Sequence, residues 1–230
     1  MLKTIIIQSF HQPLATLDRL AWVKGEVWLA GGRSKQMFSG TPNPAGGYGP
    51  QKKMKIPVTN SGGMAWDGKN LIVADRTTKV IHLLDRESGV ERDTILLADL
   101  KYFGGPEIFR VSNSEVTDID YGQGHLWATC KAGYSSVIYE IDLKAKKIVS
   151  HCRSHGPEPE GISFDTKEEY FWTIDGRNRE LSQYTNKGEW TEQLLSTPMK
   201  KPRSLGLDYK DTFWTLDLET KMVYNFRKEA

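Results

Sequence analysis

The sequence of 230 residues lacks most of the features that mark secreted, membrane-bound or nucleic-acid-binding proteins. Cys130 and Cys152 are its only cysteines, and no CxxC or Cys/His cluster suggests a zinc site. Lys and Arg number 31 against 29 Asp and Glu, which argues against a surface for specific nucleic-acid binding. The apolar run near the N-terminus, residues 5–7, is too short for a signal peptide or a membrane span. We therefore expect a cytoplasmic protein with no nucleic-acid partner and no membrane partner.

Amphipathic helices are also missing, because no stretch holds apolar residues at helical spacing for long enough. A repeat is present instead. In each copy a small-residue turn leads into a short apolar strand, and a hairpin turn then leads into an aromatic-rich strand that ends on Asp or a small residue. The second strands of the five copies lie about 42 to 55 residues apart, which is the period of a propeller blade, and they centre on Trp28, Ile72, Trp127, Trp172 and Trp214.

The repeat predicts an all-β protein, a five-bladed β-propeller with four-stranded antiparallel blades. The fifth copy stops after three strands, and residues 4–10 form an unused strand at the N-terminus. We expect this strand to complete the last blade and close the ring, with Ile5, Ile7 and Phe10 on its apolar face. Residues 1–230 would form a single domain, with blades at about 11–58, 59–98, 115–154, 156–196 and 200–227 plus 4–10.

Several conspicuous residues have a structural explanation in this register. The Trp residues of the second strands are expected to fill the space between blades. The Asp residues that end these strands, Asp75, Asp175 and Asp217, are expected to cap the following turns. Cys130 ends a second strand and Cys152 lies in a fourth strand of the same blade, so a third strand separates them and no disulfide is expected.

Two insertions interrupt the repeat, at residues 40–50 and 99–114. The first joins the third and fourth strands of the first blade, and the second joins the second blade to the third. Loops longer than about a dozen residues are often functional. Surface loops that simply tolerate insertion are the plain alternative, and the sequence leaves the choice open.

The candidate binding face follows from connectivity. With the strands of a blade lettered a to d from the axis outward, the d–a connections and b–c turns emerge on one face. Cations occupy four of the five b–c turns, and a first strand adds another: Arg33, Arg76, Lys131, Arg177 and Arg203. Such a ring suits a carboxylate, a phosphate or an acidic protein surface, because Arg offers a planar bidentate fork. The simpler interpretation is a solvated face on which each cation pairs with a nearby acid.

The mouth of the central channel is set by one residue of each first strand: Asp18, Gly62, Thr117, Glu160 and Arg203. A divalent cation between Asp18 and Glu160 is conceivable, but Arg203 competes for both, so no cofactor is expected. Glu160 is the candidate general acid or base of an enzyme, although a neighbouring Arg often neutralises such a Glu. No Ser-His-Asp order, GxSxG, P-loop or HExxH motif is present.

The blade sequence resembles a known signature. Residues 61–75 read SGGMAWDGKNLIVAD, and residues 159–165 and 171–176 read PEGISFD and FWTIDG. These segments resemble the GLAWDGxxLWVAD signature of plant-type glutamine cyclotransferase-like proteins and of related NHL and virginiamycin B lyase propellers. The glutaminyl cyclase activity motif is matched only in part, by Gly47-Tyr48-Gly49. The resemblance therefore implies a fold and a ligand-binding face.

We predict a propeller that binds an anionic small molecule or an acidic protein surface on the face of the d–a connections and b–c turns. The alternative is a small cytosolic lyase, hydrolase or cyclase in which Glu160 is the acid or base and the Arg ring stabilises negative charge. The absence of a catalytic constellation favours the first hypothesis. The sequence leaves the oligomeric state open.

Overall fold

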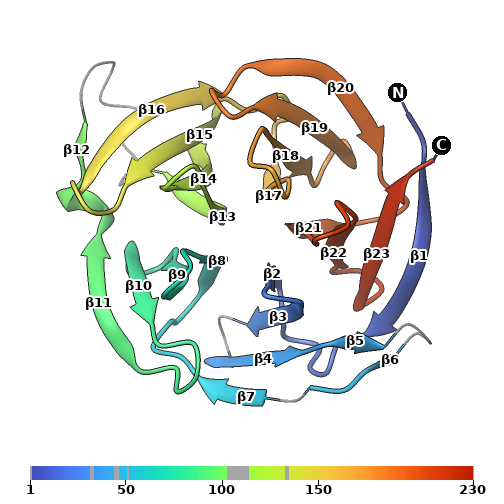
Figure 1. The fold of residues 1–230 in the computed structure, drawn as a ribbon, viewed down its shortest axis with the longest axis horizontal. Helices are drawn as coiled ribbons and strands as arrows, with labels where there is room; N and C mark the ends of the chain where they lie inside the picture. The colour runs from blue at the N-terminus through green and yellow to red at the C-terminus, as the bar shows by residue number, and fades with distance from the viewer. Residues whose placement is uncertain are drawn as a thin grey trace.

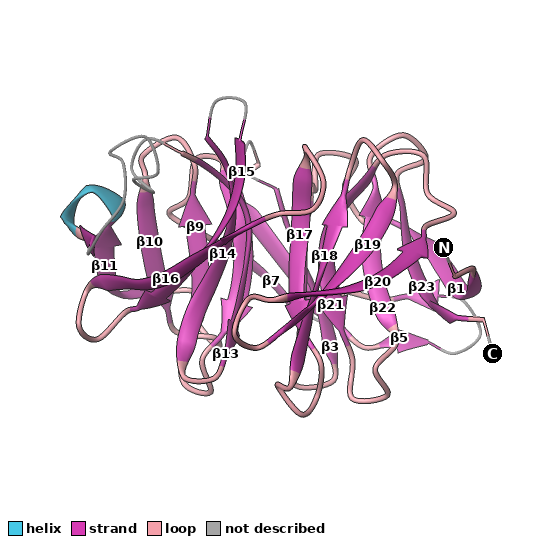
Figure 2. Cartoon of the chain, turned by 90° about the horizontal axis from the view of Figure 1, so that it is seen from above, coloured by secondary structure: helices cyan, strands magenta, loops and turns pink. Residues whose placement is uncertain are grey.

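The computed structural model describes residues 2–31, 34–43, 47–50, 52–102, 114–132 and 135–229. Five sheets, the blades, surround a central axis, and the first strand of each blade lies nearest that axis (Figure 1). Seen at right angles, the strands run between the two faces of the ring (Figure 2). The prediction of an all-β, five-bladed propeller is confirmed.

The strands of each blade follow one another from the axis outward. The first blade contains β2 (Arg19–Val23), β3 (Glu26–Gly31), β4 (Gln36–Gly40) and β7 (Lys52–Lys55). The second contains β8 (Ser61–Trp66), β9 (Leu71–Asp75), β10 (Val80–Leu84) and β11 (Glu91–Leu96). The third contains β13 (Glu115–Gly122), β14 (His125–Ala132), β15 (Ser135–Asp142) and β16 (Lys147–Arg153).

The remaining two blades complete the ring. The fourth contains β17 (Pro159–Phe164), β18 (Tyr170–Asp175), β19 (Glu180–Thr185) and β20 (Trp190–Ser196). The fifth contains β21 (Pro202–Leu207), β22 (Phe213–Asp217), β23 (Met222–Lys228) and, outermost, β1 (Thr4–His11). The Trp residues of the second strands are buried between blades, as expected, and both cysteines are free, with β15 between them.

Both insertions contain regular structure. The first forms a hairpin of β5 (Pro42–Asn43) and β6 (Gly47–Tyr48). The second begins with a 3₁₀ turn, η1 (Leu97–Asp99), and continues into β12 (Lys101–Tyr102), which pairs in parallel with β16. The third blade thus has a fifth strand that the repeat does not predict. Residues 103–113 of this insertion lie outside the described residues.

Ring closure by the N-terminal strand is confirmed. Strand β1 pairs antiparallel with β23, so both ends of the chain lie on the fifth blade (Figure 1). Buried Phe10 stacks on Tyr48 at 4.8 Å between ring centroids, which ties the closing strand to the hairpin of the first blade. Ile5 and Ile7, expected beside Phe10 on the buried face, are exposed. A bulge between Ile6 and Gln8 shifts the register and breaks the alternation of the strand.

The closing strand should stabilise the fold through Phe10 more than through its isoleucines. Phe10→Ala should lower the free energy of unfolding by about 3–5 kcal/mol, because it leaves a cavity beside Tyr48 and Trp214. The matched change Ile6→Ala removes a side chain that is 48% exposed and should cost far less. Urea unfolding of the two variants measures the difference. Equal losses would contradict this account of closure.

The axis is held by Asp118, a fully buried residue of β13. Its Oδ2 accepts hydrogen bonds from the backbone N–H of Ile162 (3.2 Å) and of Leu205 (3.1 Å), on the innermost strands of the fourth and fifth blades. It also lies 2.9 Å from Ser204 Oγ, which lies 3.0 Å from the backbone oxygen of Leu20 in the first blade. The N–H groups that these strands turn toward the axis thereby obtain partners.

The protonation state of Asp118 follows from its burial and these contacts. Ser204 Oγ donates to Asp118 Oδ2 and to the backbone oxygen of Leu20, so its single proton is shared between the two acceptors. Burial raises the pKa of Asp118 well above its ordinary value, although the hydrogen bonds from Ser204, Leu205 and Ile162 act in the opposite direction. Burial outweighs these hydrogen bonds, so the environment of Asp118 favours its protonated form.

The second blade meets the same carboxyl through Gly63. This glycine has a φ of +137°, and a Cβ atom there would lie 2.6 Å from Asp118 Oδ1. Only glycine combines that backbone conformation with so close an approach. Four blades therefore meet at Asp118, and Ser204 links the first blade to it.

A second carboxyl, Asp120, repeats this bonding two residues along β13. Its Oδ2 accepts hydrogen bonds from the backbone N–H of Phe164 (2.8 Å) and from Ser163 Oγ (3.0 Å). Ser163 Oγ in turn accepts one from the backbone N–H of Leu207 (3.0 Å), so the third, fourth and fifth blades are linked again. Burial raises the pKa of Asp120 to about 6, despite these hydrogen bonds.

Asp120 should make stability fall as the pH rises. Its folded-state pKa lies above the unfolded value, so the stabilising, protonated form is lost between about pH 4 and pH 7. Asp120→Asn keeps the hydrogen-bond acceptor and removes the titration. Relative to this variant, the wild type should lose about 2–3 kcal/mol of unfolding free energy across that range.

Urea unfolding at several pH values measures this difference. Asp142→Asn is a control of opposite sign, because the hydrogen bond from the backbone N–H of Ala145 lowers the pKa of Asp142. Relative to that variant, the wild type should gain stability as the pH rises through the acid range. A difference between wild type and Asp120→Asn that does not change with pH would refute the assignment.

Candidate functional site

The structure brings three of the predicted site residues into contact. Glu160 begins the fourth blade and is buried; its Oε1 lies 2.7 Å from Lys131 Nζ and its Oε2 lies 3.0 Å from Arg203 Nη2. Lys131 is the penultimate residue of β14 and Arg203 is the second residue of β21, so three neighbouring blades contribute. We call Lys131, Glu160 and Arg203 the mouth cluster. It holds two cations on one carboxylate and therefore carries a net positive charge.

Arg177 lies next to the mouth cluster but is exposed. It belongs to the turn after β18, and a Cβ atom on the preceding Gly176 would lie 2.9 Å from Glu160 Cγ. Its backbone N–H donates to Asp175 Oδ1 at 3.0 Å, which fixes the turn while the side chain extends into solvent. Arg177 can therefore add a cation to the mouth cluster.

Arg76 has a different environment from the one expected of a ligand-binding cation. Its Nε and Nη2 donate to the backbone oxygen of Ser61 (3.2 and 3.1 Å), and its Nη1 donates to Glu115 Oε1 (2.8 Å). The side chain is only 11% exposed. Arg76 thus links the second blade to the third and has little remaining capacity to bind a ligand.

The other predicted residues form hydrogen bonds within their own blades or lie outside the described residues. Thr117 is buried, and its hydroxyl donates to the backbone oxygen of Thr129 (3.1 Å) within its own blade. Asp18 is half-buried at the start of the first blade, where its backbone N–H donates to the oxygen of Ala30 (3.0 Å). Arg33 lies outside the described residues.

The strand-ending aspartates organise this face more fully than the sequence suggests. Asp175 accepts hydrogen bonds from the backbone N–H of Arg177 and Asn178 in its b–c turn, and from Glu158 in the d–a connection. Asp75 and Asp217 do the same for their blades. Burial opposes ionisation of Asp75, but the hydrogen bonds from Thr59, Thr78 and Thr77 outweigh it and lower its pKa. The capping role is confirmed, and each Asp also joins two loops of the face.

A channel cation is not supported by the placement of its proposed ligands. Glu160 is bound by Lys131 and Arg203. Within the described ranges, no three His, Cys, Asp or Glu side chains are grouped so that they could hold a metal ion.

In the same part of the chain, no helix is long and apolar enough to cross a membrane.

Comparison with known proteins shows the fold. No protein-family model and no curated protein sequence matches the chain. Among solved structures, the glutaminyl cyclase of Myxococcus xanthus superposes with a TM-score of 0.73 at 11% identity, covering 99% of this chain and 97% of that one. The Swd1 β-propeller domain of Myceliophteria thermophila gives a TM-score of 0.58 at 11% identity, covering 97% and 99%.

A structure of a nidogen/laminin complex is a third neighbour, with a TM-score of 0.57, 14% identity, and coverage of 93% of this chain and 78% of that one. The neighbours thus include an enzyme, and propellers whose structures contain other proteins. At such low identity the likeness establishes a β-propeller fold, while the function depends on this chain's own residues.

The mouth cluster should stabilise the folded protein as well as give this face a positive charge. Glu160→Gln should lower the free energy of unfolding by about 1–3 kcal/mol, because it removes a buried charged acceptor from two cations. Glu219→Gln is the matched control; it breaks the Lys200–Glu219 pair, in which both side chains are mostly exposed, and should change stability far less. Urea unfolding at low and high salt tests both variants. A Glu160→Gln variant as stable as the control would mean that the cluster does not hold the blades together.

Proposed function

We propose that this propeller binds an anionic group at the face of the d–a connections and b–c turns. The group would contact Lys131 and Arg203, the two cations of the mouth cluster. The group would be the carboxylate or phosphate of a small molecule, or the acidic side chains of a protein partner. The observation that carries the proposal is the pairing of two cations with a single buried carboxylate. One further negative charge would neutralise the cluster.

The cations of the mouth cluster keep donors for such a ligand. Lys131 is 29% exposed and Arg203 is 18% exposed, so neither is sealed by its contact with Glu160. A guanidinium carries five N–H donors, and the pairing with Glu160 uses one nitrogen of Arg203. Glu160 would then act as a positioning residue, because its buried carboxylate holds both cations in place.

The enzyme hypothesis receives less support from the same geometry. Glu160 Oε1 accepts a hydrogen bond from Lys131, and Oε2 forms an ion pair but no hydrogen bond with Arg203. The buried carboxylate is therefore held ionised between two cations, which does not suit it to transfer a proton. The alternative remains testable, because one fold neighbour is a glutaminyl cyclase. A peptide that begins with Gln would release ammonia on cyclisation, and we expect no release above the uncatalysed rate.

Binding should respond to cations of this face only. We would titrate tripolyphosphate, as a small anion, and a hexaglutamate peptide, as an acidic protein segment, by calorimetry at low and at physiological ionic strength. Arg177→Ala and Lys131→Met should each weaken the binding about five- to tenfold, since a charge-assisted hydrogen bond contributes on the order of 1 kcal/mol or more. Lys69→Ala, on the opposite face, should have no effect.

The two probes separate the two kinds of ligand. Binding of tripolyphosphate alone would identify a small-molecule site, and stronger binding of the peptide would identify a protein-binding surface. Failure of both probes, or an equal response to Lys69→Ala, would overturn the proposal.

A further inference from the structure

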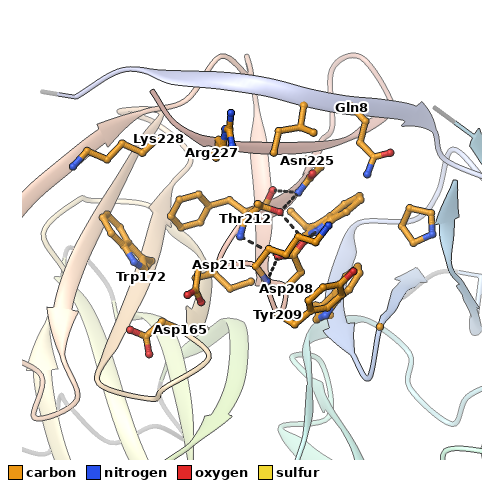
Figure 3. Close-up of a pocket in the computed structure, with 18 of the residues that line it drawn as sticks. Gln8, Asp165, Trp172, Asp208, Tyr209, Asp211, Thr212, Asn225, Arg227 and Lys228 are labelled. Atoms are coloured by element: carbon orange, nitrogen blue, oxygen red, sulfur yellow. Dashed lines mark hydrogen bonds between the residues drawn. The ribbon is translucent and has the colours of Figure 1, made fainter. Parts of the chain in front are cut away.

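A cavity of about 740 Å³ is lined by the closing strand and by parts of the first, fourth and fifth blades (Figure 3). Its walls include the turn from Asp208 to Thr212, between β21 and β22, and Asp165 at the end of β17. Such a–b turns lie at the far ends of the first strands from Glu160 and Arg203. The first blade adds Trp22 to the wall, and the closing strand adds Gln8. The cavity is therefore separate from the proposed anion-binding face.

A fixed network of hydrogen bonds forms one wall. Asp208 Oδ1 accepts from the backbone N–H of Lys210 (2.8 Å) and Thr212 (3.0 Å), and its Oδ2 accepts from Thr212 Oγ1 (2.6 Å) and Trp214 Nε1 (3.0 Å). Asn225 Nδ2 donates to Thr212 Oγ1 (2.6 Å), as Figure 3 shows. These groups are held in place before any ligand arrives, which lowers the entropic cost of binding.

Aromatic rings form another wall, and one of them is unusually exposed. Trp22 stacks on Trp214 with ring centroids 5.4 Å apart, and Tyr209 lies 6.2 Å from Trp22. Tyr209 is 67% exposed although it is a large aromatic side chain. Its ring has Trp22 beside it and Lys210 Nζ 5.5 Å from its centroid, and the rest of the side chain is open to contact with a ligand.

The closing strand contributes an acceptor that has no partner. Gln8 Oε1 is buried and forms no hydrogen bond, and the Gln8 side chain lines the cavity (Figure 3). Buried acceptors are almost always bonded, because an unmet one carries a desolvation cost. Rotation of the Gln8 amide toward the cavity would let a ligand hydroxyl donate to this oxygen and remove that cost.

The charges of the cavity cancel. The lining carboxylates, Asp165, Asp208 and Asp211, are equal in number to the lining cations, Lys210, Arg227 and Lys228. A site without net charge does not select an ion, whereas both signs and the amide of Gln183 can bond to hydroxyl groups. Aromatic faces next to such groups suit the C–H surface of a sugar ring.

We propose that this cavity is a binding site for a neutral saccharide, of the size of one or two sugar rings. The rings would lie against Tyr209 and Trp22, and a ligand hydroxyl would donate to Gln8. The volume falls within the range of small-molecule sites. The site adds a ligand class that the mouth cluster does not recognise.

Calorimetry and saturation-transfer NMR on the full chain test the proposal, with maltose, cellobiose and N,N′-diacetylchitobiose as probes. At least one should bind, and Tyr209→Ala should weaken that binding about tenfold or more. Tyr170→Ala is the matched control, because Tyr170 is also exposed but lies outside the cavity lining, and it should leave binding unchanged.

Gln8→Met provides a second test that does not depend on loss of structure. It removes the unmet acceptor, so the melting temperature should stay the same or rise while saccharide affinity falls at least about fivefold. Arg177→Ala should leave saccharide binding intact, which separates this site from the anion-binding face. The proposal is wrong if none of the three disaccharides binds, if Tyr209→Ala binds as tightly as wild type, or if choline competes for the cavity as a cationic ligand.

Discussion

A single buried carboxyl, Asp118, satisfies the constraint on which the ring depends. The innermost strand of each blade is a sheet edge whose backbone groups face the axis, and these groups need partners away from water. Asp118 supplies them for the fourth and fifth blades, reaches the first through Ser204, and excludes every residue but glycine from position 63 in the second. The blades are thus joined by hydrogen bonds at the axis as well as by apolar packing between their faces.

This constraint also explains why the repeat loses its regularity near the axis. The corresponding positions of the five inner strands hold four different residue types: Arg19, Gly63, Asp118, Gly161 and Ser204. A ring of five identical residues could not do the same work, because five carboxyls would repel and five glycines would leave the edges unbonded. The buried layer around Asp118 lies between the two faces, so the proposed anion and saccharide sites are structurally independent.

The proposed binding face arises where one blade departs from the others. The second, fourth and fifth blades end their second strand with an Asp that ties two loops together. In the third blade the corresponding residue is Cys130, whose buried thiol has a raised pKa, and Lys131 follows it. The Lys131 side chain contacts Glu160 of the next blade.

The sequence by itself determined the five-blade architecture, ring closure by the N-terminal strand and the aspartate caps. These features follow from strand period, alternation and turn chemistry, which act over a few residues or repeat along the chain. Only the tertiary structure decided the roles of Asp118 and Asp120, the exposure of Ile5 and Ile7 beside a bulge, the parallel strand β12 and the cavity around Tyr209. Each of these depends on contacts between strands or blades that are distant in the chain, for which the local pattern contains no signal.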